Sequence, residues 1–577
     1  MARTALPLNS ELADRFDLLA DLLELDGADA FRLQAYRRAA QRIRESAVPV
    51  AQLALEQKAT RLSGIGPTIQ EKIVQYSTTG DMSALAKVRA RIPEGLVDVM
   101  HVPGLGPKTA RKLWQELGVT SVQELRAAAE AERLRTLTGL GAKTEEKVLA
   151  HLARPRAEAD TGRALLGRVL PLVQSVVAGL SAHPAAVRVS EAGSVRRRCE
   201  TVKDLDVIAT AIDAAALIEA FTSSEWVAEV VAKGGTKATV LSGDGLAFDL
   251  RVVQPECYGN LLQHFTGSKA HNVALREDAV RRGLSVSEYG VQVAETGELL
   301  RHATEEELYE LLGYAWMPPE LREDRGELLA AREGRLPRLV ELSDIQGDLH
   351  VHTTYSDGRH SLEEMVAAAL AQGHRYIAIC DHARRLRDGA LERQAEEIAT
   401  VNERLGGRLT VLSGVEVDIR SDGSLDLVEE ELAARDWVMA SIHFGFDQPR
   451  ERLTARLAAA MESPHVDCIG HPTGRKIGKR PPYELDFDAV LAKAVETGTF
   501  LELNAQPDRL DLDDVHARAA GEAGVWVVVS TDAHRTWEVQ NLQFGVAQAR
   551  RGWLSAEQVV NTRPWPEVRG MLKAQKP

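Results

Sequence analysis

The sequence has few cysteines and no long apolar segment. Its four cysteines, Cys199, Cys257, Cys380 and Cys468, lack the C-x-x-C spacing of zinc ribbons and redox pairs. They indicate reduced thiols rather than a disulfide framework, and we do not expect them to bind metal. No run of about 18 apolar residues occurs, as a membrane helix would need, and the first residues have no apolar core of signal-peptide length. We therefore expect a cytoplasmic protein with no membrane partner.

The chain also lacks an excess of positive charge, which would usually accompany a nucleic-acid partner. Its formal net charge is -14 over 577 residues, a length that needs several domains. Residues 1–160, however, carry 23 Lys and Arg against 21 Asp and Glu. The acidity lies in the remaining residues, where some acidic side chains are candidate metal ligands. The net charge therefore does not exclude nucleic acid.

A short glycine pattern is present three times within residues 1–160, at Gly64 and Gly66, Gly104 and Gly106, and Gly139 and Gly141. Each G-x-G turn follows an apolar residue and precedes an amphipathic helix, at whose start Lys108 and Lys143 stand in the second and third copies. Two glycines allow a tight turn, and the amides at the helix N-terminus can hold a phosphate oxygen. The copies resemble helix-hairpin-helix motifs, which hold the DNA backbone without reading its sequence. A repeated structural hairpin without a ligand is the alternative.

The middle of the chain contains a Gly-Ser turn followed by two aspartates. Residues 193–206 read GSVRRRCETVKDLD, and Asp204 and Asp206 stand two apart in an apolar run. On a strand both carboxylates face the same side, and Asp249, in the alternating stretch 247–253, would be a third. A site that keeps neighbouring carboxylates ionised usually holds a divalent cation, while the turn offers amide and hydroxyl groups for phosphate. For this stretch alone, a surface turn and a strand with two solvated acids is the alternative.

A further turn and helix follow at residues 264–272, HFTGSKAHN. Together with the Gly-Ser turn, the D-x-D pair and Asp249, this segment resembles the family X DNA polymerases of the beta type. The N-terminal hairpins match that family's DNA-binding regions, so the resemblance covers residues 1–320. It implies that Asp204, Asp206 and Asp249 hold two Mg²⁺ or Mn²⁺ ions, with Asp249 taking the proton of the primer 3′-hydroxyl. It also implies nucleotide contacts at Gly193, Ser194, Arg197, Arg156, Phe265, Gly267 and Asn272.

His264 and Thr68 differ from that family's pattern. His264 stands where the family commonly has a tyrosine, and we therefore predict measurable ribonucleotide incorporation. Lys72 falls where family members keep a Schiff-base lysine that removes 5′-deoxyribose phosphate. Such a lysine needs nearby cations, and Thr68 stands where the beta enzymes carry one of them. A lysine that only binds phosphate is the equal alternative.

The C-terminal part places ligand-type residues directly after apolar strands. Strand and helix patterns alternate from residue 345 onward, which predicts a barrel whose site forms at the C-terminal ends of its strands. A lone histidine in such a place is usually structural, but nine ligand-type residues in such places are not a plausible coincidence. They are His350, His352, Asp357, His382, Glu416, His443, His471, Asp532 and His534.

This set resembles the polymerase-and-histidinol-phosphatase (PHP) domain, a distorted barrel that binds up to three metals. The resemblance implies one metal on His350, His352, Glu416 and Asp532, a second on Glu416, His443 and His471, and a third on Asp357, His382 and His534. Mixed nitrogen and oxygen ligands suit Zn²⁺ or Mn²⁺, and such a cluster indicates phosphoester hydrolysis. Arg475, shortly after His471, would hold a DNA strand. A solvated basic loop is the alternative for that position.

These observations predict a multidomain protein. An all-α region with helix-hairpin-helix motifs is expected in residues 1–85 and 86–160, followed by an α+β nucleotidyltransferase palm in 161–255. A thumb-like, nucleotide-selecting subdomain in 256–320 and a charged helical linker in 321–344 would precede a distorted (β/α)7-type barrel in 345–577.

The predicted function is gap-filling DNA synthesis for repair, on gapped or primer-template DNA with dNTPs. The barrel would supply a 3′-5′ exonuclease, with an abasic-site endonuclease as a further candidate activity. In one alternative the barrel is a small-molecule phosphatase or a structural module. In another the whole chain is a non-catalytic DNA-end-binding protein, against which intact Asp204, Asp206 and Asp249 argue. We expect a monomer that works in the cytoplasm, at the nucleoid.

Overall fold

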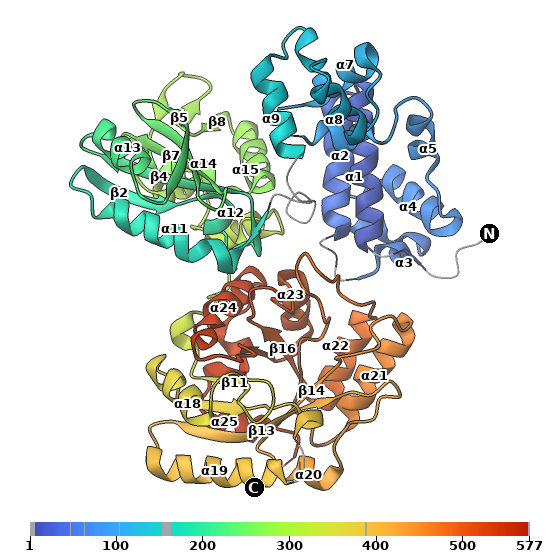
Figure 1. The fold of residues 1–577 in the computed structure, drawn as a ribbon, viewed down its shortest axis with the longest axis vertical. Helices are drawn as coiled ribbons and strands as arrows, with labels where there is room; N and C mark the ends of the chain where they lie inside the picture. Colours follow the sequence, from blue (N-terminus) through green and yellow to red (C-terminus); the bar gives the residue numbers. More distant parts are fainter. Residues whose placement is uncertain are drawn as a thin grey trace. The chain divides into compact units, whose positions relative to one another are not determined.

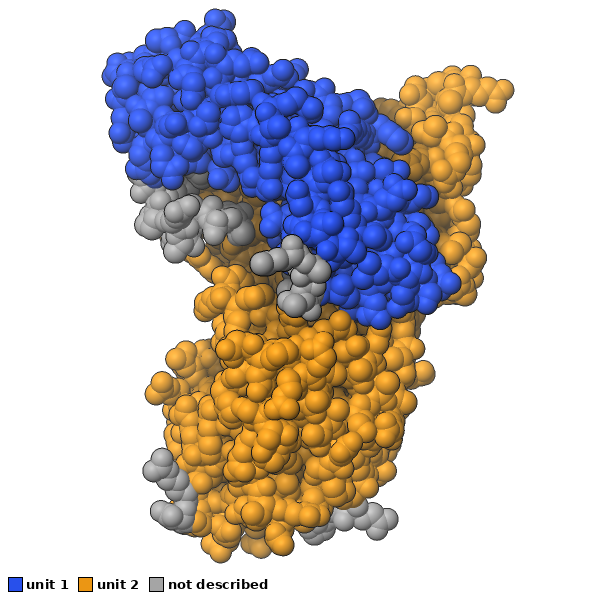
Figure 2. Space-filling view, turned by 90° about the vertical axis from the view of Figure 1, so that its right-hand side faces the viewer, with its two compact units in different colours: residues 1–162 blue, residues 163–577 orange. Residues whose placement is uncertain are grey.

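The computed structural model (Figure 1) describes residues 6–7, 9–44, 46, 48–62, 64–102, 104–152, 163–386 and 389–574. The chain divides into two compact units, residues 1–162 and residues 163–577, which Figure 2 shows in different colours. Each unit has its own hydrophobic cores. Among the described residues, no helix combines the length and the apolar character needed to cross a membrane.

The first unit is helical throughout its described residues. Helix α1 (Asn9–Asp26) is amphipathic because Leu12, Phe16, Leu19 and Leu23 recur at spacings of three or four, and its buried face packs along α2 (Ala30–Arg44). The rings of Phe16 and Tyr36 stack between these helices, with centroids 6.2 Å apart. The other helices are α3 (Val50–Leu55), α4 (Pro67–Thr79), α5 (Ser83–Arg89), α6 (Leu96–Met100), α7 (Pro107–Leu117), α8 (Val122–Glu130) and α9 (Ala142–Leu152).

Each of the three G-x-G turns enters a helix, α4, α7 or α9 (Figure 1). The first glycine of each turn has a positive φ, 85° at Gly64, 87° at Gly104 and 93° at Gly139, a conformation that other residues adopt only with strain. Pro67 and Pro107 then occupy the first helical position, where the missing N–H would have had no partner in the helix. The second glycine of each turn is exposed, with open space where a side chain would lie. The start of each of these helices therefore faces solvent.

The second unit begins with a five-stranded sheet in the order β2-β4-β7-β6-β5. Strands β4 (Asp204–Ala211) and β7 (Ala247–Val253) form its parallel pair. Helices α11 (Leu166–Ser181) and α13 (Ala214–Thr222) share a core with this sheet that includes Val169, Val207 and Phe248. The remaining strands of this part are β1 (Ala164–Leu165), β2 (Ala186–Glu191), β3 (Thr201–Val202), β5 (Val227–Lys233) and β6 (Lys237–Ser242).

A smaller sheet in the order β10-β9-β8 follows, with helices packed against it. Residues 321–344, predicted as a charged helical linker, contain one α-helix, α17 (Glu327–Arg332), and are partly packed against this subdomain. Arg322 is fully buried, and Glu305 balances its charge, with Oε1 2.6 Å from Arg322 Nη1. The other elements are α14 (Tyr258–Thr266), α15 (Lys269–Arg281), α16 (Glu305–Leu311), β8 (Leu284–Ser287), β9 (Gly290–Val293) and β10 (Leu299–Leu300).

The remaining residues form a barrel of seven parallel strands in sequence order. A bridge between Val351 and Ala533 joins the first strand to the end of the last, and His352 N donates to the carbonyl of Ala533 at 2.8 Å. The strands are almost entirely buried, as expected when helices cover a parallel sheet. They are β11 (Gly347–Val351), β12 (Tyr376–Ile379), β13 (Thr410–Asp418), β14 (Trp437–Ser441), β15 (Cys468–Ile469), β16 (Phe500–Asn504) and β17 (Val527–Ser530).

Helices surround this barrel (Figure 1). Ser361, Asp486 and Asp513 cap the N-termini of α18, α22 and α23, each accepting from the backbone amide three residues on. The helices are α18 (Leu362–Ala371), α19 (Ala390–Leu405), α20 (Glu429–Ala433), α21 (Arg450–Glu462), α22 (Phe487–Thr497), α23 (Asp514–Ala523), α24 (Leu542–Arg551) and α25 (Trp565–Met571). The predicted fold class, a helical hairpin region, an α+β body with a thumb and a parallel barrel, is confirmed.

Candidate metal centres of the palm and the barrel

The palm sheet brings three aspartates together. Asp206 of β4 lies directly opposite Asp249 of β7 in the parallel register, and Asp204 is two residues earlier on the same strand. The three carboxylates therefore share one face of the sheet. Burial, followed by the charges of Asp249 and Asp204, raises the pKa of Asp206 to about 6. Thr239 donates to Asp249 Oδ1 at 2.5 Å and holds that carboxylate in place.

A glycine is packed against these carboxylates. Gly193 begins the single-turn helix α12 (Gly193–Arg196) with a φ of 63°. A Cβ atom at this position would lie 2.6 Å from Asp206 Oδ2, so any side chain here would force the Asp206 carboxylate to move. Ser194 follows in the same turn, and its carbonyl accepts a hydrogen bond from Cys199 N at 3.0 Å. The Gly-Ser turn is therefore directly beside the aspartates.

The three arginines after this turn are all paired with glutamates. Arg196 and Arg198 form their ion pairs at 2.8 Å and 2.6 Å. Arg197 Nε lies 3.0 Å from Glu323 Oε1, and its guanidinium also donates to the carbonyl of Thr266. Because Thr266 precedes Gly267, the two segments predicted to contact a nucleotide are joined to each other.

The residues predicted to contact the sugar and base lie around the turn between α14 and α15: Phe265 near the end of α14, Gly267 in the turn and Asn272 in the first turn of α15. Gly267 has a φ of 69°, which favours glycine at this position. The guanidinium carbon of Arg251 lies 4.4 Å from the centre of the Phe265 ring. Asn272 donates from its side-chain amide to the carbonyl of His264 at 2.8 Å. The structure thus places Asn272 beside the turn with its amide bonded inside the protein.

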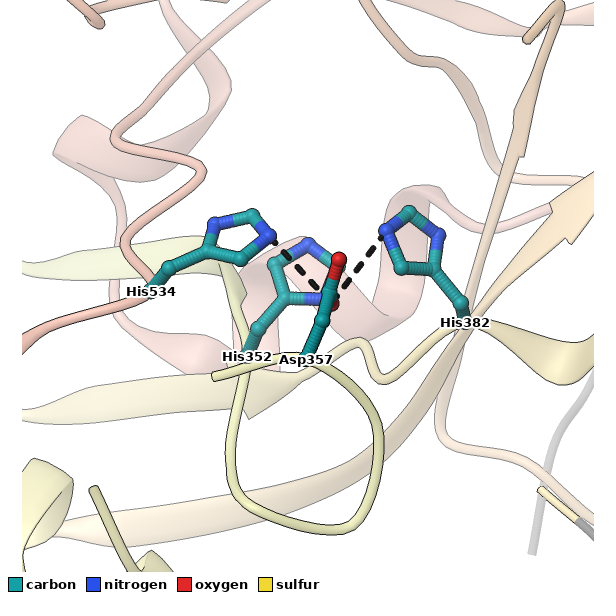
Figure 3. Close-up of side chains that lie close together, drawn as sticks. All are labelled: His352, Asp357, His382 and His534. Carbon is teal, nitrogen blue, oxygen red and sulfur yellow. Dashed lines mark ion pairs between the residues drawn. The ribbon is translucent and has the colours of Figure 1, made fainter. Parts of the chain in front are cut away.

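The nine ligand-type residues of the barrel lie at the C-terminal ends of its strands or in the loops that follow; we call them the barrel centre. Possible ligand atoms in three groups lie within 4.8 Å of one another. His471 joins the third group through Glu416, with Nε2 3.2 Å from Oε1. The groups are His352, Asp357, His382 and His534, which Figure 3 shows; His350, His352 and Asp532; and His382, Glu416 and His443.

These groups overlap with the three metal sets that the family resemblance implies, but they do not coincide with them. Asp357 Oδ1 lies 3.5 Å from His382 Nε2 and 3.4 Å from His534 Nε2, so these three residues are together (Figure 3). His352 also faces this group. His382 Nδ1 is 2.8 Å from Glu416 Oε2, an oxygen of a different implied set. His352 and His382 therefore each lie where they could bind either of two metal ions.

The barrel centre contains buried polar atoms without a hydrogen-bond partner among the described residues. They include Nε2 of His350, both ring nitrogens of His352 and both carboxylate oxygens of Glu416. Buried polar groups are normally satisfied, and metal ligation would satisfy these. Burial, followed by the charges of neighbouring histidines, lowers the pKa of His352 to about 3, so its ring is neutral, as metal binding requires. The residues therefore fit a metal cluster.

Further carboxylates hold these ligands, and the sequence prediction missed them. Glu502 Oε1 lies 2.7 Å from His350 Nδ1, and Asp418 Oδ1 lies 2.6 Å from His443 Nδ1. Such partners orient ligating rings and raise their basicity. Asp418 is the last residue of the apolar strand β13, the same signal that identified the candidate ligands, whereas Glu502 lies in the middle of β16 and carries a weaker form of that signal.

Arg156, predicted to contact the nucleotide, lies outside the described residues. Arg475, predicted to hold DNA, is buried between the barrel and the palm, with Nη2 2.6 Å from Glu200 Oε2 and 2.7 Å from the carbonyl of Leu510. A guanidinium whose N–H groups are used in this way has few left for a phosphate. The DNA contact predicted for Arg475 therefore gains no support from its surroundings in the structure.

Lys72 lines a cavity of about 530 Å³ in the first unit. Its ammonium nitrogen lies 5.9 Å from the centre of the Tyr36 ring. Arg32, Lys87 and Arg91 line the same cavity although they come from other parts of the sequence. Asp26 also lines the cavity and pairs with Arg91 at 2.7 Å, so Arg32 and Lys87 are the cations that the fold adds near Lys72.

The two centres define a class of protein. Three carboxylates beside a Gly-Ser turn suit nucleotidyl transfer, and a histidine-rich centre at the mouth of a barrel suits metal-dependent hydrolysis of phosphoesters. The chain thus combines a nucleotidyltransferase fold with a phosphoesterase barrel. Known families match successive parts of the chain: a helix-hairpin-helix domain over residues 7–82, a SAM-like helix-hairpin-helix tandem over 96–154, the DNA polymerase beta thumb over 261–323 and the PHP domain over 348–506.

Individual relatives narrow the class further. The DNA polymerase/3′-5′ exonuclease PolX of Bacillus subtilis (strain 168) is 38% identical over 569 residues, which cover 96% of this chain and 98% of that protein. A probable phosphatase of Thermoanaerobacter sp. (strain X514) is 30% identical over 226 residues, 37% of this chain and 89% of the phosphatase. The chain therefore belongs to the family X DNA polymerases that carry a PHP domain. This confirms the resemblance inferred from the sequence.

Proposed function

We propose that this chain synthesises DNA on gapped or primer-template substrates from deoxynucleoside triphosphates. The observation that carries the proposal is the near-complete match to a protein named as a polymerase and exonuclease, in a chain with three aspartates on one face of the palm. A protein that only binds DNA ends would not need Asp204, Asp206 and Asp249 in this arrangement, which argues against the non-catalytic alternative.

In the proposed palm site, Asp204, Asp206 and Asp249 hold Mg²⁺ or Mn²⁺. When bound, these ions would neutralise phosphate charge and activate the primer 3′-hydroxyl. Asp249, held by Thr239, receives the proton of that hydroxyl. The triphosphate is contacted by Gly193, Ser194 and Arg197, and the sugar and base by Phe265, Gly267 and Asn272.

To the barrel centre we assign a 3′-5′ exonuclease with up to three Zn²⁺ or Mn²⁺ ions. Bound metal would supply hydroxide near neutral pH and positive charge for the phosphodiester. The chain itself keeps His352 neutral through burial and orients His350 and His443 through neighbouring carboxylates. Cleavage at abasic sites is a further candidate reaction of the same centre.

A small-molecule phosphatase is the second candidate function for the barrel, because probable phosphatases match this part of the chain. A DNA strand is favoured by an exposed ring near the barrel centre. Trp537, 55% exposed, stands three residues after His534 in a short 3₁₀ helix. Its ring lies edge to face against His360, with centroids 5.5 Å apart, and 5.3 Å from the guanidinium of Arg535. An exposed ring of this kind can stack on a nucleobase, whereas a small phosphate ester without a base gains nothing from it.

The three hairpins of the first unit are proposed to hold the DNA backbone. Their second glycines are open to solvent, and Lys108 and Lys143 are exposed in the first turns of α7 and α9. Free amides and positive charge at a helix N-terminus favour a phosphate. The contacts would be independent of sequence, as repair of arbitrary gaps requires.

For Lys72 we propose Schiff-base chemistry on 5′-deoxyribose phosphate, because Arg32, Lys87 and Arg91 line the same cavity. Phosphate binding without catalysis is the alternative. Borohydride trapping on incised abasic DNA separates the two. We expect a covalent adduct with wild type and none with Lys72→Ala, and a wild type that forms no adduct would leave phosphate binding as the role of this lysine.

One assay series tests both centres, on gapped and 3′-recessed DNA with Mg²⁺ or Mn²⁺. We expect Asp204→Ala/Asp206→Ala to lose synthesis and keep degradation, and His350→Ala/His352→Ala to do the reverse. Degradation that survives the histidine changes would remove the exonuclease from the barrel, and synthesis that survives the aspartate changes would refute the palm site. Light scattering on the purified chain tests the proposed monomer.

A further inference from the structure

One buried arginine of the barrel reaches the polymerase part of the chain. Arg551 ends helix α24 and is 8% exposed. Its Nη1 lies 2.9 Å from the carbonyl oxygen of Arg197 and 2.9 Å from Glu323 Oε1, while its Nη2 lies 2.7 Å from Asp514 Oδ2. A barrel side chain is therefore bonded to the backbone of the residue proposed to bind the triphosphate.

Glu323 is shared between two arginines. Its Oε1 accepts from Arg551 Nη1 at 2.9 Å and from Arg197 Nε at 3.0 Å. All three side chains are largely buried, so each charge depends on the others for compensation. With Arg551 present, the negative charge of Glu323 is divided between two cations. Without it, Glu323 would hold the Arg197 guanidinium more strongly.

The same loop is held at a second point. Arg475 Nη2, also from the barrel, lies 2.6 Å from Glu200 Oε2. Between the two contacts Arg198 has a φ of 55°, a left-handed conformation that is strained for a non-glycine residue. A strained loop keeps its shape only where surrounding contacts determine it. Here two of those contacts, from Arg551 and Arg475, belong to the barrel.

We propose that Arg551 is a positioning residue of the polymerase site: it fixes the backbone at Arg197 and shares Glu323, and through both contacts it sets the position of the Arg197 guanidinium. This rests on the proposed polymerase function. The barrel then has a second role, support of nucleotide binding by the palm, which involves none of the residues of the barrel centre. Loss of Arg551 weakens triphosphate binding more than it slows the chemical step.

The neighbouring residue is a matched control. Arg550, the penultimate residue of α24, also crosses to the polymerase part, where its Nε lies 2.8 Å from Glu320 Oε1. Its other hydrogen bond among the described residues goes to the carbonyl of Val340 at 3.1 Å. Replacing Arg550 therefore removes a crossing arginine without a direct effect on Arg197.

Single-nucleotide gap filling by the full chain provides the test, with KM for the incoming triphosphate and kcat measured separately. We expect Arg551→Ala to raise KM about tenfold, as for loss of a hydrogen bond to a charged group, with kcat changed by about twofold at most. Arg551→Lys keeps a cation and recovers part of the affinity, whereas Arg550→Ala keeps the wild-type KM. In an Arg197→Ala background the Arg551 change adds no further rise, because it acts through Arg197.

An unchanged KM in Arg551→Ala overturns the proposal. An equal rise in Arg550→Ala also overturns it, because general loosening of the contact would then suffice, and so does an additive rise in the Arg197→Ala background. Exonuclease rate and thermal unfolding on the same preparations report folding. If Arg551→Ala fails to fold, Arg551→Lys and Arg551→Gln carry the same comparison. A wild type that fills no gap refutes the proposed polymerase function itself.

Discussion

Among single residues, Gly193 is the one whose replacement disturbs the palm site most directly. An added Cβ would lie 2.6 Å from Asp206 Oδ2, and the φ of 63° disfavours any side chain. We expect Gly193→Ala to slow gap filling about a hundredfold, the effect of a misplacement of about 1 Å in a catalytic site, while exonuclease activity persists. Primer extension and strand degradation, measured on one preparation, report both.

The control for this change is Gly179→Ala. Gly179 lies inside helix α11, and an added Cβ would have nothing within 4 Å of it. This variant should keep both activities and gain up to about 1 kcal/mol of stability, because alanine favours a helix interior over glycine. Gap filling at the wild-type rate in Gly193→Ala would contradict the close packing of the Gly-Ser turn on Asp206.

His264 leads to a prediction about which sugar the incoming nucleotide can carry. Its Nδ1 lies 2.8 Å from Arg276 Nη2 of α15, which holds the imidazole beside Phe265. The family commonly has the phenol of a tyrosine at this position. We expect wild type to incorporate ribonucleotides measurably and His264→Tyr to incorporate roughly tenfold fewer, within the range for one altered contact in a specificity pocket. Competition between ribonucleotides and deoxynucleotides in primer extension measures this. Strict deoxynucleotide selection by wild type would count against it.

The residues found from the sequence share a local signal. Asp204 and Asp206 are two apart in a strand, and the ligands of the barrel centre follow apolar strands. Partners distant along the chain carry no such signal: Arg197 and Glu323 are 126 residues apart. Arg475 shows the consequence, because a basic loop after His471 looks like a nucleic-acid contact until the fold places Glu200 against it.

Among the elements, strand β16 contains no predicted metal ligand, but its Glu502 pairs with the ring of His350. We expect Glu502→Gln to lower metal affinity or exonuclease rate by about 10- to 100-fold, as for other carboxylates that orient ligating histidines, with gap filling unchanged. Metal content and strand degradation measure the effect. Glu496→Gln, exposed on helix α22, should behave as wild type. Full metal content and rate in Glu502→Gln would show that His350 needs no such orientation.

The short 3₁₀ helix that contains Trp537 allows a test of whether the barrel centre acts on DNA or on a small phosphate ester. Removing the exposed ring in Trp537→Ala should raise KM for single-stranded DNA about 5- to 100-fold, the equivalent of about 1–3 kcal/mol of base stacking. Hydrolysis of a simple alkyl phosphate, which has no ring to stack, should not change. Trp526→Ala is the control, because Trp526 is also exposed but precedes β17, at the opposite end of the strand from the ligands. Equal effects of Trp537→Ala on both substrates would favour the phosphatase.

At the scale of the whole molecule, residues 163–577 form one compact unit. The sequence suggested a charged helical linker at 321–344 because charged residues and helical periodicity dominate that stretch. The contacts that join the polymerase part to the barrel, Arg551 with Glu323 and Arg475 with Glu200, link residues 228 and 275 apart. Periodicity identifies strands, helices and hairpins, but it cannot pair side chains over such distances.

This arrangement predicts where the chain can be cut. A fragment of residues 163–577 should unfold in one cooperative transition and keep exonuclease activity. A fragment of residues 345–577 should be destabilised by about 1 kcal/mol for each hydrogen bond that is lost, because Arg475 and Arg551 would lose Glu200 and Glu323, although Arg551 keeps Asp514. Denaturant unfolding of both fragments measures the difference. If the barrel alone were as stable as the larger fragment, its arginines would not depend on the palm, and the support they give to the loop at Arg197 would have to come from elsewhere.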